Sequence, residues 1–374
     1  MMHPGSRTDD AIHREREVLD ACARIPEIDD AAREQALARQ RTLTKPPGAL
    51  GRLEELHGWM AGVRGTAMLP PPSPVIIVAA ADHGVATEGV SAYPSAVTAQ
   101  MVRNFVSGGA AINVLAAHAG ARVLIVDAGV AADFEAPVRD AITTVKLRQA
   151  TDNIAAGPAM TRAECVHLLA RGIEIARELA NDGADALGLG DMGIGNTTAA
   201  AALTSVFTGH RPALTVGRGT GIDDARYAVK REVVERALAL QAPTPDDPIG
   251  ALTALGGFEM AFLAGVAIGG AAARCAVLLD GYPTTAAALA AAALAPAAVE
   301  FMLASHRSAE PGHELALAHL GLRPLLDLDM RLGEGTGAAL ACSLLTAALR
   351  IPRDMATFDS AGVSRAEDAL VPET

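Results

Sequence analysis

The sequence predicts an α/β fold in which a doubly wound, mostly parallel sheet carries helices on both of its faces. From residue 75 onward, short apolar runs of strand length alternate with longer segments of helical pattern. Such runs are typical of strands that are buried on both faces, and their alternation with helices is typical of parallel sheets. Half of the residues are hydrophobic but only 3% are aromatic, so small apolar residues let helices and strands pack closely.

Two proline clusters separate the N-terminal part of the chain from the rest. Residues 9–40 are charged and helix-prone, and Pro46–Gly48 then forces a turn before a helix over about 50–63. The cluster at 70–74 is a stiff connector, at which we place the boundary of the main domain. We expect an N-terminal helical part at 1–70, an α/β domain at 75–349, and a polar tail at 350–374 that packs with the N-terminal helices or frays.

Periodicity predicts the order of elements in the main domain. Strands are expected at 75–81, 123–127, 142–147, 185–189, 275–280 and 325–328. Helices are expected at 95–119, 161–181, 197–207, 224–241, 257–273, 283–304 and 337–349. Because ligands bind at the carboxyl ends of parallel strands, the loops after these strands are candidate sites. Four such loops are rich in glycine or polar residues: 82–93, 188–198, 217–224 and 333–337.

Charge and cysteine content exclude several classes of function. There are 31 Lys and Arg against 43 Asp and Glu, and a net charge of −12 disfavours binding to nucleic acid or an anionic membrane. The N-terminus has no apolar run of signal-peptide type, and the longest uncharged stretches are too weakly apolar to span a membrane. The four cysteines are at least 67 residues apart, which excludes a CxxC pair and favours buried thiols in the cytoplasm.

The glycine-rich loop after residue 188 matches a dinucleotide-binding pattern only in part. Gly188, Gly190 and Gly193 fit G-x-G-x-x-G, but the acid expected about 20 residues later is missing, which disfavours a dinucleotide site. Two interpretations stay open for the Asn-Thr-Thr at 196–198. It forms either a phosphate site at a helix N-terminus or only a helix cap after a tight turn.

Three further loops carry charged side chains. Glu334 lies between glycines before an apolar helix; it is a general base with a raised pKa or, as the residues alone favour, a loop acid stabilised by the helix dipole. Asp82 and His83 follow the first strand, and we interpret them as groups that bond the loop backbone, because the histidine spacing gives no metal site. Lys230 either pairs with a phosphate or carboxylate or is a solvated helix charge.

Several segments, taken together and in this order, resemble one enzyme family. They are LTKPPGALGRLE at 43–54, ADHGVATEGVSAYP at 81–94, GGAAINVLAAHAGA at 108–121, GDMGIGNTTAAAA at 190–202, SHRSAEPGH at 305–313 and MRLGEGTGAALA at 330–341. Over about residues 20–350 the chain resembles the nicotinate-nucleotide–dimethylbenzimidazole phosphoribosyltransferases. The resemblance implies a doubly wound sheet with a small helical domain from both chain ends, and a homodimer that uses no cofactor.

The resemblance also implies a reaction on small-molecule substrates. The family transfers the 5-phosphoribosyl group from nicotinate mononucleotide to 5,6-dimethylbenzimidazole, for the assembly of the cobalamin nucleotide loop. The products are nicotinate and α-ribazole 5′-phosphate, so the anomeric carbon inverts. Because the nicotinate of the donor is a pyridinium and already a good leaving group, no metal is needed to activate it. A base must instead take the N–H proton of the incoming benzimidazole.

The family motifs imply roles for individual residues of this chain. Glu334 matches the general base, and Asp191 and Lys230 are the other residues implied in catalysis. The turn that resembles the family's phosphate-holding turn comprises Gly193, Gly195, Asn196, Thr197 and Thr198. Ser308 matches a serine near the phosphoribosyl site.

The expected pocket for the base departs from the family pattern. Tyr93 and Met101 correspond to positions that line this pocket, but other members carry smaller or more polar groups there. The remaining substrate-binding residues are Met192, Leu332 and Gly333, of which the first two add apolar walls. Asp191 stands where some members carry Glu, so its carboxylate is retracted by one methylene. Two alternatives follow: a transferase that prefers another lower-ligand base, or a non-catalytic protein that binds nicotinate mononucleotide on the same fold.

Overall fold

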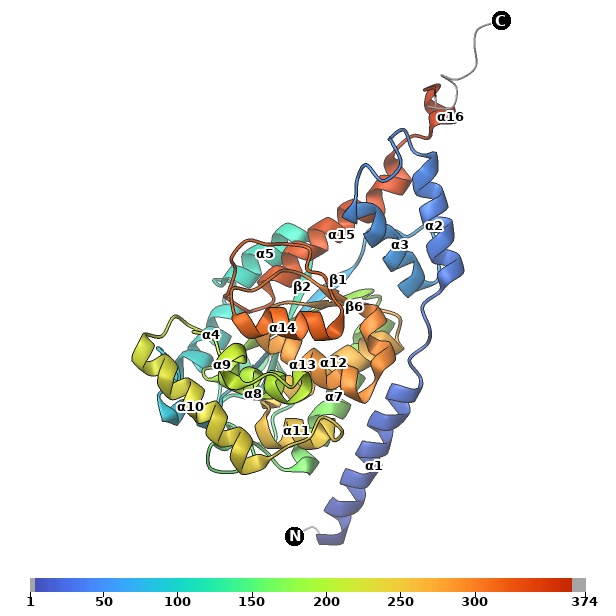
Figure 1. The fold of residues 1–374 in the computed structure, drawn as a ribbon. Helices are drawn as coiled ribbons and strands as arrows, with labels where there is room; N and C mark the ends of the chain where they lie inside the picture. The colour runs from blue at the N-terminus through green and yellow to red at the C-terminus, as the bar shows by residue number, and fades with distance from the viewer. Residues whose placement is uncertain (1–3, 365–374) are drawn as a thin grey trace, which may run out of the picture. The chain divides into compact units, whose positions relative to one another are not determined.

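The computed structural model describes residues 4–364, with side chains from residue 12 onward (Figure 1). The chain forms two compact units: Met1–Pro26 with Ser73–Ala341, and Glu27–Pro72 with Cys342–Thr374. The first helix, α1 (Pro4–Ala23), therefore groups with the larger unit, whereas the sequence suggested a place in the N-terminal helical part. The outer ends of the first and last predicted segments, 1–3 and 365–374, lie outside the described residues.

The larger unit is built on a six-stranded sheet in which every neighbouring pair of strands is parallel. The strands are β1 (Pro74–Ala81), β2 (Arg122–Gly129), β3 (Thr143–Thr144), β4 (Ala186–Met192), β5 (Ala276–Leu279) and β6 (Met302–Ala304). Their order is β3-β2-β1-β4-β5-β6, which confirms the predicted doubly wound sheet. The chain leaves β1 in one direction and returns to its other side for β4, so a switch point lies between these two strands.

The central strands are buried on both faces, as their unbroken apolar runs predict. All eight residues of β1 are buried. Ile76 pairs with Gly188 in β4, and a Cβ on Gly188 would lie 3.1 Å from the Cβ of Ala338. Leu187 points to the opposite face, where its side chain lies against Gly270. The alternation of small and large residues thus lets a helix approach the sheet closely from each side.

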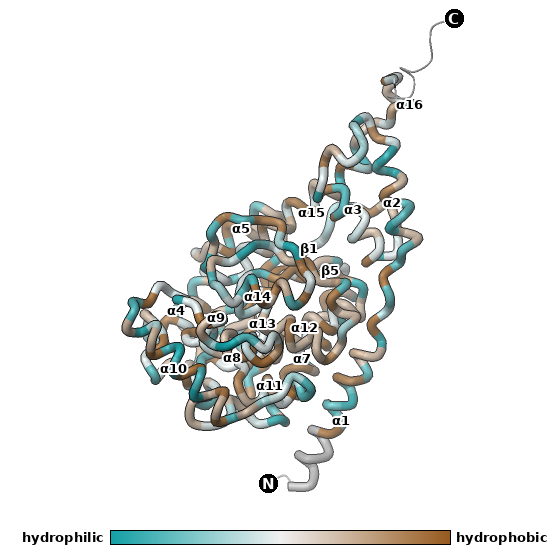
Figure 2. The backbone as a smooth tube through the Cα atoms, viewed as in Figure 1, coloured by the Kyte–Doolittle hydropathy of each residue, from teal (hydrophilic) through white to brown (hydrophobic). Residues whose placement is uncertain are grey.

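One face of the sheet is covered by α12 (Phe258–Ala272), against which α7 (Arg162–Asn181) packs. All but the last residue of α12 are buried, and Figure 2 shows this helix mainly in pale and brown tones. The absence of a side chain at Gly172 allows the close contact, because a Cβ there would lie 2.1 Å from the carbonyl oxygen of Phe262. A helix that is apolar all round needs such cover on every side, and α13 (Tyr282–Leu294) supplies part of it.

The opposite face is covered by α5 (Ala111–Ala119) and by the beginning of α15 (Thr336–Asp354). The single helix predicted over 95–119 is wrong, since α4 (Ala96–Val106) ends before α5 begins. The break lies at Gly108, whose φ of +77° is left-handed and ends the first helix.

Other predicted elements also differ from the structure. The helix predicted over 283–304 ends early, because Pro296 starts the 3₁₀ helix η2 (Pro296–Phe301) and β6 follows. The strand predicted at 325–328 is wrong; Leu326 forms only an isolated parallel bridge with His306. The strand predicted at 142–147 shrinks to the two residues of β3.

The remaining helices of the larger unit connect or flank these layers. They are η1 (Gly84–Glu88), α6 (Ala136–Arg139), α8 (Asn196–Thr208), α9 (Pro212–Thr215), α10 (Asp224–Gln241), α11 (Pro248–Leu255) and α14 (Pro311–Leu320). Between residues 4 and 364 no helix has the length and apolarity that a membrane span requires.

The smaller unit combines a segment near the N-terminus with the C-terminal part of the chain. It contains α2 (Asp30–Thr42), α3 (Arg52–Arg64), the end of α15 and α16 (Phe358–Ala361). Leu43 and Thr357 form an antiparallel bridge, and the Thr44 N–H donates to the Ala356 carbonyl at 3.1 Å. The Arg39 Nε also donates to the Pro352 carbonyl at 3.1 Å. Residues after 350 are therefore hydrogen-bonded to α2 and to the segment that follows it.

Candidate active site

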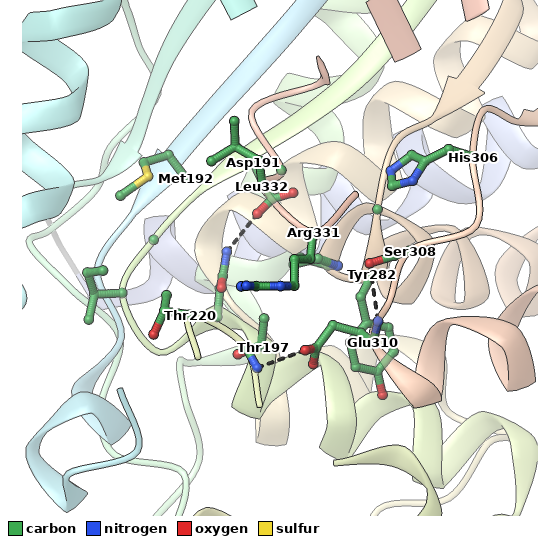
Figure 3. Close-up of a pocket in the computed structure, with 17 residues that line it drawn as sticks. Asp191, Met192, Thr197, Thr220, Tyr282, His306, Ser308, Glu310, Arg331 and Leu332 are labelled. Carbon is green, nitrogen blue, oxygen red and sulfur yellow. Dashed lines mark hydrogen bonds between the residues drawn. The ribbon is translucent and has the colours of Figure 1, made fainter. Parts of the chain in front are cut away.

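A cavity with both polar and apolar lining residues lies where the strands of the sheet end. It contains about 630 Å³ of space free of protein atoms, part of it open to solvent, and Figure 3 shows its lining. The lining residues come from the end of β4, from the segments that follow β4, β5 and β6, and from two further loops: Asp191, Met192, Gly193, Ile194, Asn196, Thr197, Gly219, Thr220, Gly281, Tyr282, Pro283, His306, Ser308, Glu310, Arg331, Leu332 and Gly333. This position is where ligands bind in doubly wound sheets.

Asp191 is a buried acid in the wall of this cavity. It lies near the end of β4, and its Oδ2 accepts a hydrogen bond from the Asn196 side chain at 2.7 Å. Its Oδ1 is buried and has no partner among the described residues. Burial, reinforced by the charges of Asp280 and Glu259, raises the pKa of Asp191 well above its ordinary value. A buried oxygen without a partner in a cavity is an acceptor available to a ligand.

The turn between β4 and α8 is shaped by two glycines. A Cβ on Gly193 would lie 2.3 Å from the carbonyl oxygen of Ala81, and Gly195 has a left-handed φ of +98°. The turn aims Asn196 and Thr197 at the cavity, whereas Gly195 and the fully buried Thr198 are not in its lining.

The structure decides against the interpretation that this turn only caps a helix. The N-cap of α8 is Gly195, and no side chain accepts a hydrogen bond from the first turn of the helix. Asn196 bonds Asp191, and Thr197 accepts from Lys230, so neither acts as a cap. The Asn196 and Thr198 N–H groups donate to the Gly193 and Gly195 carbonyls at 3.2 and 3.0 Å. The helix dipole, the Thr197 N–H and the Thr197 hydroxyl group are the features here that suit a phosphate.

Lys230 lies behind the cavity wall. From α10 its Nζ donates to Thr197 Oγ1 at 2.8 Å and to the Gly217 carbonyl at 3.1 Å. Burial lowers the pKa of Lys230 to about 8, while the nearby Glu310 charge acts in the opposite direction. Lys230 is therefore not a solvated helix charge, and its hydrogen bond to Thr197 connects it to the cavity lining.

Glu334 is held in an unusual backbone conformation beside the cavity. Gly333, Glu334 and Gly335 have φ values of +87°, +63° and +86°, so three successive residues are left-handed. This conformation costs free energy at a residue with a side chain, and the flanking glycines remove that cost at the neighbouring positions. Leu332 and Gly333 line the cavity, but Glu334 itself is not among the lining residues.

The Glu334 carboxylate is buried and accepts a hydrogen bond from the start of α5. Its Oε2 receives the Ile112 N–H at 3.3 Å. Burial raises the pKa of Glu334, and the Asp280 charge raises it further, although the Ile112 hydrogen bond lowers it. The helix whose N-terminus contacts this carboxylate is thus α5, whereas the sequence suggested α15, the helix that follows Glu334 in the chain.

Asp280 holds the loop that carries Glu334, and the sequence did not point to it. It follows β5 directly and is fully buried. Its Oδ2 accepts the Gly335 N–H at 3.0 Å, and its Oδ1 accepts the Gly337 and Ala338 N–H groups at 2.6 and 3.3 Å. His306 Nε2 lies 3.6 Å from the same Oδ1. The only local signal is an acid at the end of the apolar run CAVLLD.

Asp82 has the backbone-bonding role that the sequence predicts, but His83 has a different one. The Oδ2 of Asp82 accepts the Ala131 N–H at 2.8 Å, which is the expected backbone bond. His83 instead pairs with Glu259 of α12, Nε2 to Oε1 at 2.8 Å, so the backbone role predicted for it is wrong. The negative charges of Glu259 and Asp82 outweigh burial and raise the pKa of His83. In residues 4–364 no cluster of His, Cys, Asp and Glu has the arrangement of a metal site.

Ser308 and Glu310 form the side of the cavity that follows β6. The Ser308 N–H donates to His313 Nδ1 at 2.9 Å, and Glu310 Oε1 accepts the Gly219 N–H at 2.8 Å. Glu310 was not singled out from the sequence, although it lies in the segment SHRSAEPGH.

Two of the residues expected around the base lie outside this cavity. Met192 and the exposed Leu332 line it. Tyr93 is 55% exposed and Met101 lies on α4, and neither is in the lining. The Ala92 N–H, next to Tyr93, donates to Thr220 Oγ1 at 3.4 Å, so this segment borders the loop that carries Thr220.

Known proteins resemble this chain over most of its length. A family model described as phosphoribosyltransferase matches residues 25–363. A relative from Roseiflexus castenholzii, named nicotinate-nucleotide–dimethylbenzimidazole phosphoribosyltransferase, is 52% identical over 93% of this chain and 98% of its own. One of the same name from Chloroflexus aggregans is 52% identical over 92% of this chain and 97% of its own.

A solved structure agrees with the fold. The crystal structure of the enzyme of that name from Thermus thermophilus has a TM-score of 0.85 and 46% identity, and covers 91% of this chain and 100% of that chain. The family match spans every segment that lines the cavity, from Asp191 to Gly333. On the strength of this match and this identity, the chain belongs to the phosphoribosyltransferase family that the model describes.

Proposed function

We propose that this enzyme transfers the 5-phosphoribosyl group of nicotinate mononucleotide to 5,6-dimethylbenzimidazole. The names of relatives that share about half of its residues support these substrates. The observation that carries the proposal is the buried Glu334, whose pKa is raised, in the loop that also lines the cavity. The products are nicotinate and α-ribazole 5′-phosphate, which serves the assembly of the cobalamin nucleotide loop.

The step that needs a base is the attack on the anomeric carbon. One nitrogen of the benzimidazole forms a bond to C1′ of the ribose, the C1′–N bond to nicotinate breaks, and its electron pair neutralises the pyridinium. Glu334 takes the proton from the other benzimidazole nitrogen. A raised pKa suits this role, since a base is most effective when its pKa lies near the working pH. Attack from the face opposite nicotinate inverts the anomeric carbon.

The remaining lining residues bind the phosphoribosyl group and the base. The first turn of α8, with Asn196 and Thr197, receives the phosphate, and Lys230 orients the Thr197 hydroxyl group. Asp191 Oδ1 accepts a ribose hydroxyl group, and Ser308 lies on the side after β6. Met192 and Leu332 provide apolar contacts for the benzimidazole.

The wider setting belongs to the same proposal. A homodimer and a cytoplasmic location follow from the resemblance to the family, and Tyr93 and Met101 contact the base in that assembly. The buried thiols of Cys165, Cys275 and Cys342 support a reducing compartment.

The proposal is tested with purified protein, nicotinate mononucleotide and a panel of acceptors. Dimethylbenzimidazole, benzimidazole, adenine and a phenol are supplied in turn, and products are identified by mass. We expect α-ribazole phosphate with the first acceptor. Binding of the mononucleotide without product from any acceptor would instead identify a non-catalytic binding protein.

The role of Glu334 has its own test. Glu334→Gln keeps the size of the side chain but removes the base, so kcat falls by roughly 10²- to 10⁴-fold. Glu314→Gln is the matched control, because Glu314 is an exposed residue of α14 outside the cavity. Retention of the wild-type rate by Glu334→Gln contradicts the role of this residue as the base.

A further inference from the structure

Arg331 points into the cavity but has no role in the reaction as described so far. It lies three residues before Glu334 in the same loop, and its side chain is exposed. It lines both the cavity and the adjoining groove that contains Arg218 and Tyr227. In the view of Figure 3, its side chain extends across the cavity, below Asp191 and above Thr197.

The Arg331 guanidinium group is not used in holding the fold. Within residues 4–364 it makes no hydrogen bond or ion pair, and its Nη1 lies 4.0 Å from where a Cβ on Gly221 would be. The arginines on neighbouring segments differ: Arg218 pairs with Asp224, and Arg307 pairs with Asp327. A guanidinium group with five free donors in a concave site matches a bidentate anion.

The charges of the cavity wall show where an anion is best bound. Asp191 and Glu310 contribute two carboxyl groups, and Arg331 is the one lining residue with a permanent positive charge. Lys230 is completely buried, and its ammonium group is already bonded to Thr197 and Gly217. A phosphate dianion at the first turn of α8 therefore lacks a direct cationic partner unless Arg331 supplies it.

We propose that Arg331 binds the 5′-phosphate of the donor together with the first turn of α8. This inference rests on the proposed function, because that function brings a phosphate into the cavity. The helix supplies its dipole, the Thr197 N–H and the Thr197 hydroxyl group, and Arg331 supplies the positive charge. Arg331 is thus a residue of substrate affinity rather than of the chemical step.

The test uses two fragments of the donor, each with one anionic group. Ribose 5-phosphate carries the phosphate, and nicotinate carries the carboxylate. In Arg331→Ala we expect the calorimetric Kd of ribose 5-phosphate to rise by roughly 10- to 100-fold and the Kd of nicotinate to stay within about twofold of wild type. The KM of nicotinate mononucleotide rises by a similar factor to that of ribose 5-phosphate, while kcat changes little.

Two further variants show whether the effect comes from the charge and planar shape of the Arg331 side chain or from a disturbed fold. Arg331→Lys keeps the charge but loses the planar fork, so it recovers only part of the lost affinity. Arg307→Ala is the control, since Arg307 lies between two lining residues but pairs with Asp327 outside the cavity. We expect wild-type affinities from it. Thermal unfolding of all three variants at the wild-type temperature shows that the fold is kept.

The other outcomes overturn the inference. A loss of affinity for nicotinate with unchanged affinity for ribose 5-phosphate would assign Arg331 to the carboxylate. Equal losses for both fragments, unchanged affinities, or no binding of ribose 5-phosphate to the wild type would each remove the phosphate role. Failure of the proposed function is seen separately, as absence of turnover by a wild type that still binds ribose 5-phosphate.

Discussion

Three buried acids near the switch point between β1 and β4 influence one another's pKa. Asp191, Asp280 and Glu334 are buried, and burial is the largest cause of the raised pKa of each. Asp280 adds its negative charge to the effect on both of the others. Because like charges at short range disfavour ionisation, these groups take up protons at a higher pH than dissolved carboxylic acids do.

This arrangement predicts the pH dependence of the reaction. In its proposed role Glu334 acts as a base only when it is ionised, and its pKa lies above the ordinary 4.5, so we expect kcat/KM for the acceptor to fall as the pH drops through that raised value. The measurement is a pH profile in which the acceptor's own protonation is titrated separately and divided out. A remaining acid limb in Glu334→Gln, or a midpoint at or below 4.5, contradicts the prediction.

The residues that could be predicted from the sequence share one property. Asp191 lies near the end of a strand, and Asn196 and Thr197 follow the glycine-rich turn after it, so local sequence places all three at the sheet edge. Asp280 and Glu259 act on segments more than 50 residues away along the chain. Only the strand order brings them there, and periodicity in one sequence does not give strand order.

Among the elements, the loop before α15 and the strand β5 work as one unit. Three N–H groups of this loop and of the start of α15 converge on the Asp280 carboxylate, which maintains the left-handed conformation of Glu334. The loop conformation thus depends on a residue at the end of another strand. Displacement of a catalytic group by about 1 Å is enough to lower a rate by 10²-fold.

Asp280→Asn is therefore expected to lower kcat by roughly 10- to 100-fold, because one amide oxygen cannot replace two carboxylate oxygens. It also removes the charge that raises the pKa of Glu334, so the acid limb of the pH profile moves to lower pH. Asp247→Asn is the control, since Asp247 caps α11 by accepting the Gly250 N–H. A change in stability without a shift of the acid limb would reduce Asp280 to a structural residue.

The contact between α7 and α12 gives a prediction for stability. A Cβ at Gly172 would lie 2.1 Å from the Phe262 carbonyl oxygen, which belongs to the backbone of the partner helix. Gly172→Ala therefore forces the helices apart, and we expect a loss of about 1–3 kcal/mol in the free energy of unfolding in urea. Gly157→Ala, which meets no atom within 4 Å, changes it by less than about 1 kcal/mol. Equal effects of the two substitutions contradict this explanation.

The strands with long apolar runs are the elements of the sheet that the sequence predicts correctly. The runs that became β1, β2, β4 and β5 are apolar enough to be recognised. The three-residue β6 follows a proline-started 3₁₀ helix and has no periodicity of its own, so the sequence pattern does not separate it from the helix before it.

At the scale of the whole molecule, the smaller unit is built from two segments that lie far apart along the chain. The segment after α2 bonds residues that come more than 300 positions later, through Leu43–Thr357 and Thr44–Ala356. A unit made of two distant segments forms only when both are present. Its stability is therefore linked to the C-terminal residues, although the sheet is not built from them.

A chain that ends at Asp354 tests this dependence. It lacks Ala356 and Thr357, so we expect faster proteolytic cleavage and faster hydrogen exchange at residues 40–50, with unchanged protection of β1 and β4. A chain that ends at Gly362 keeps both partners and is the control. Unchanged protection of residues 40–50 in the shorter chain contradicts the prediction.

The crowded carboxyl groups near Asp191 have a thermodynamic consequence for any charged ligand. These acids keep their protons to a higher pH than free carboxylic acids do, and a positive charge placed beside them lowers their pKa. An anionic group placed beside them has the opposite effect on their pKa. Binding of a charged ligand is therefore accompanied by a change in the number of bound protons, and its heat of binding varies with the ionisation enthalpy of the buffer.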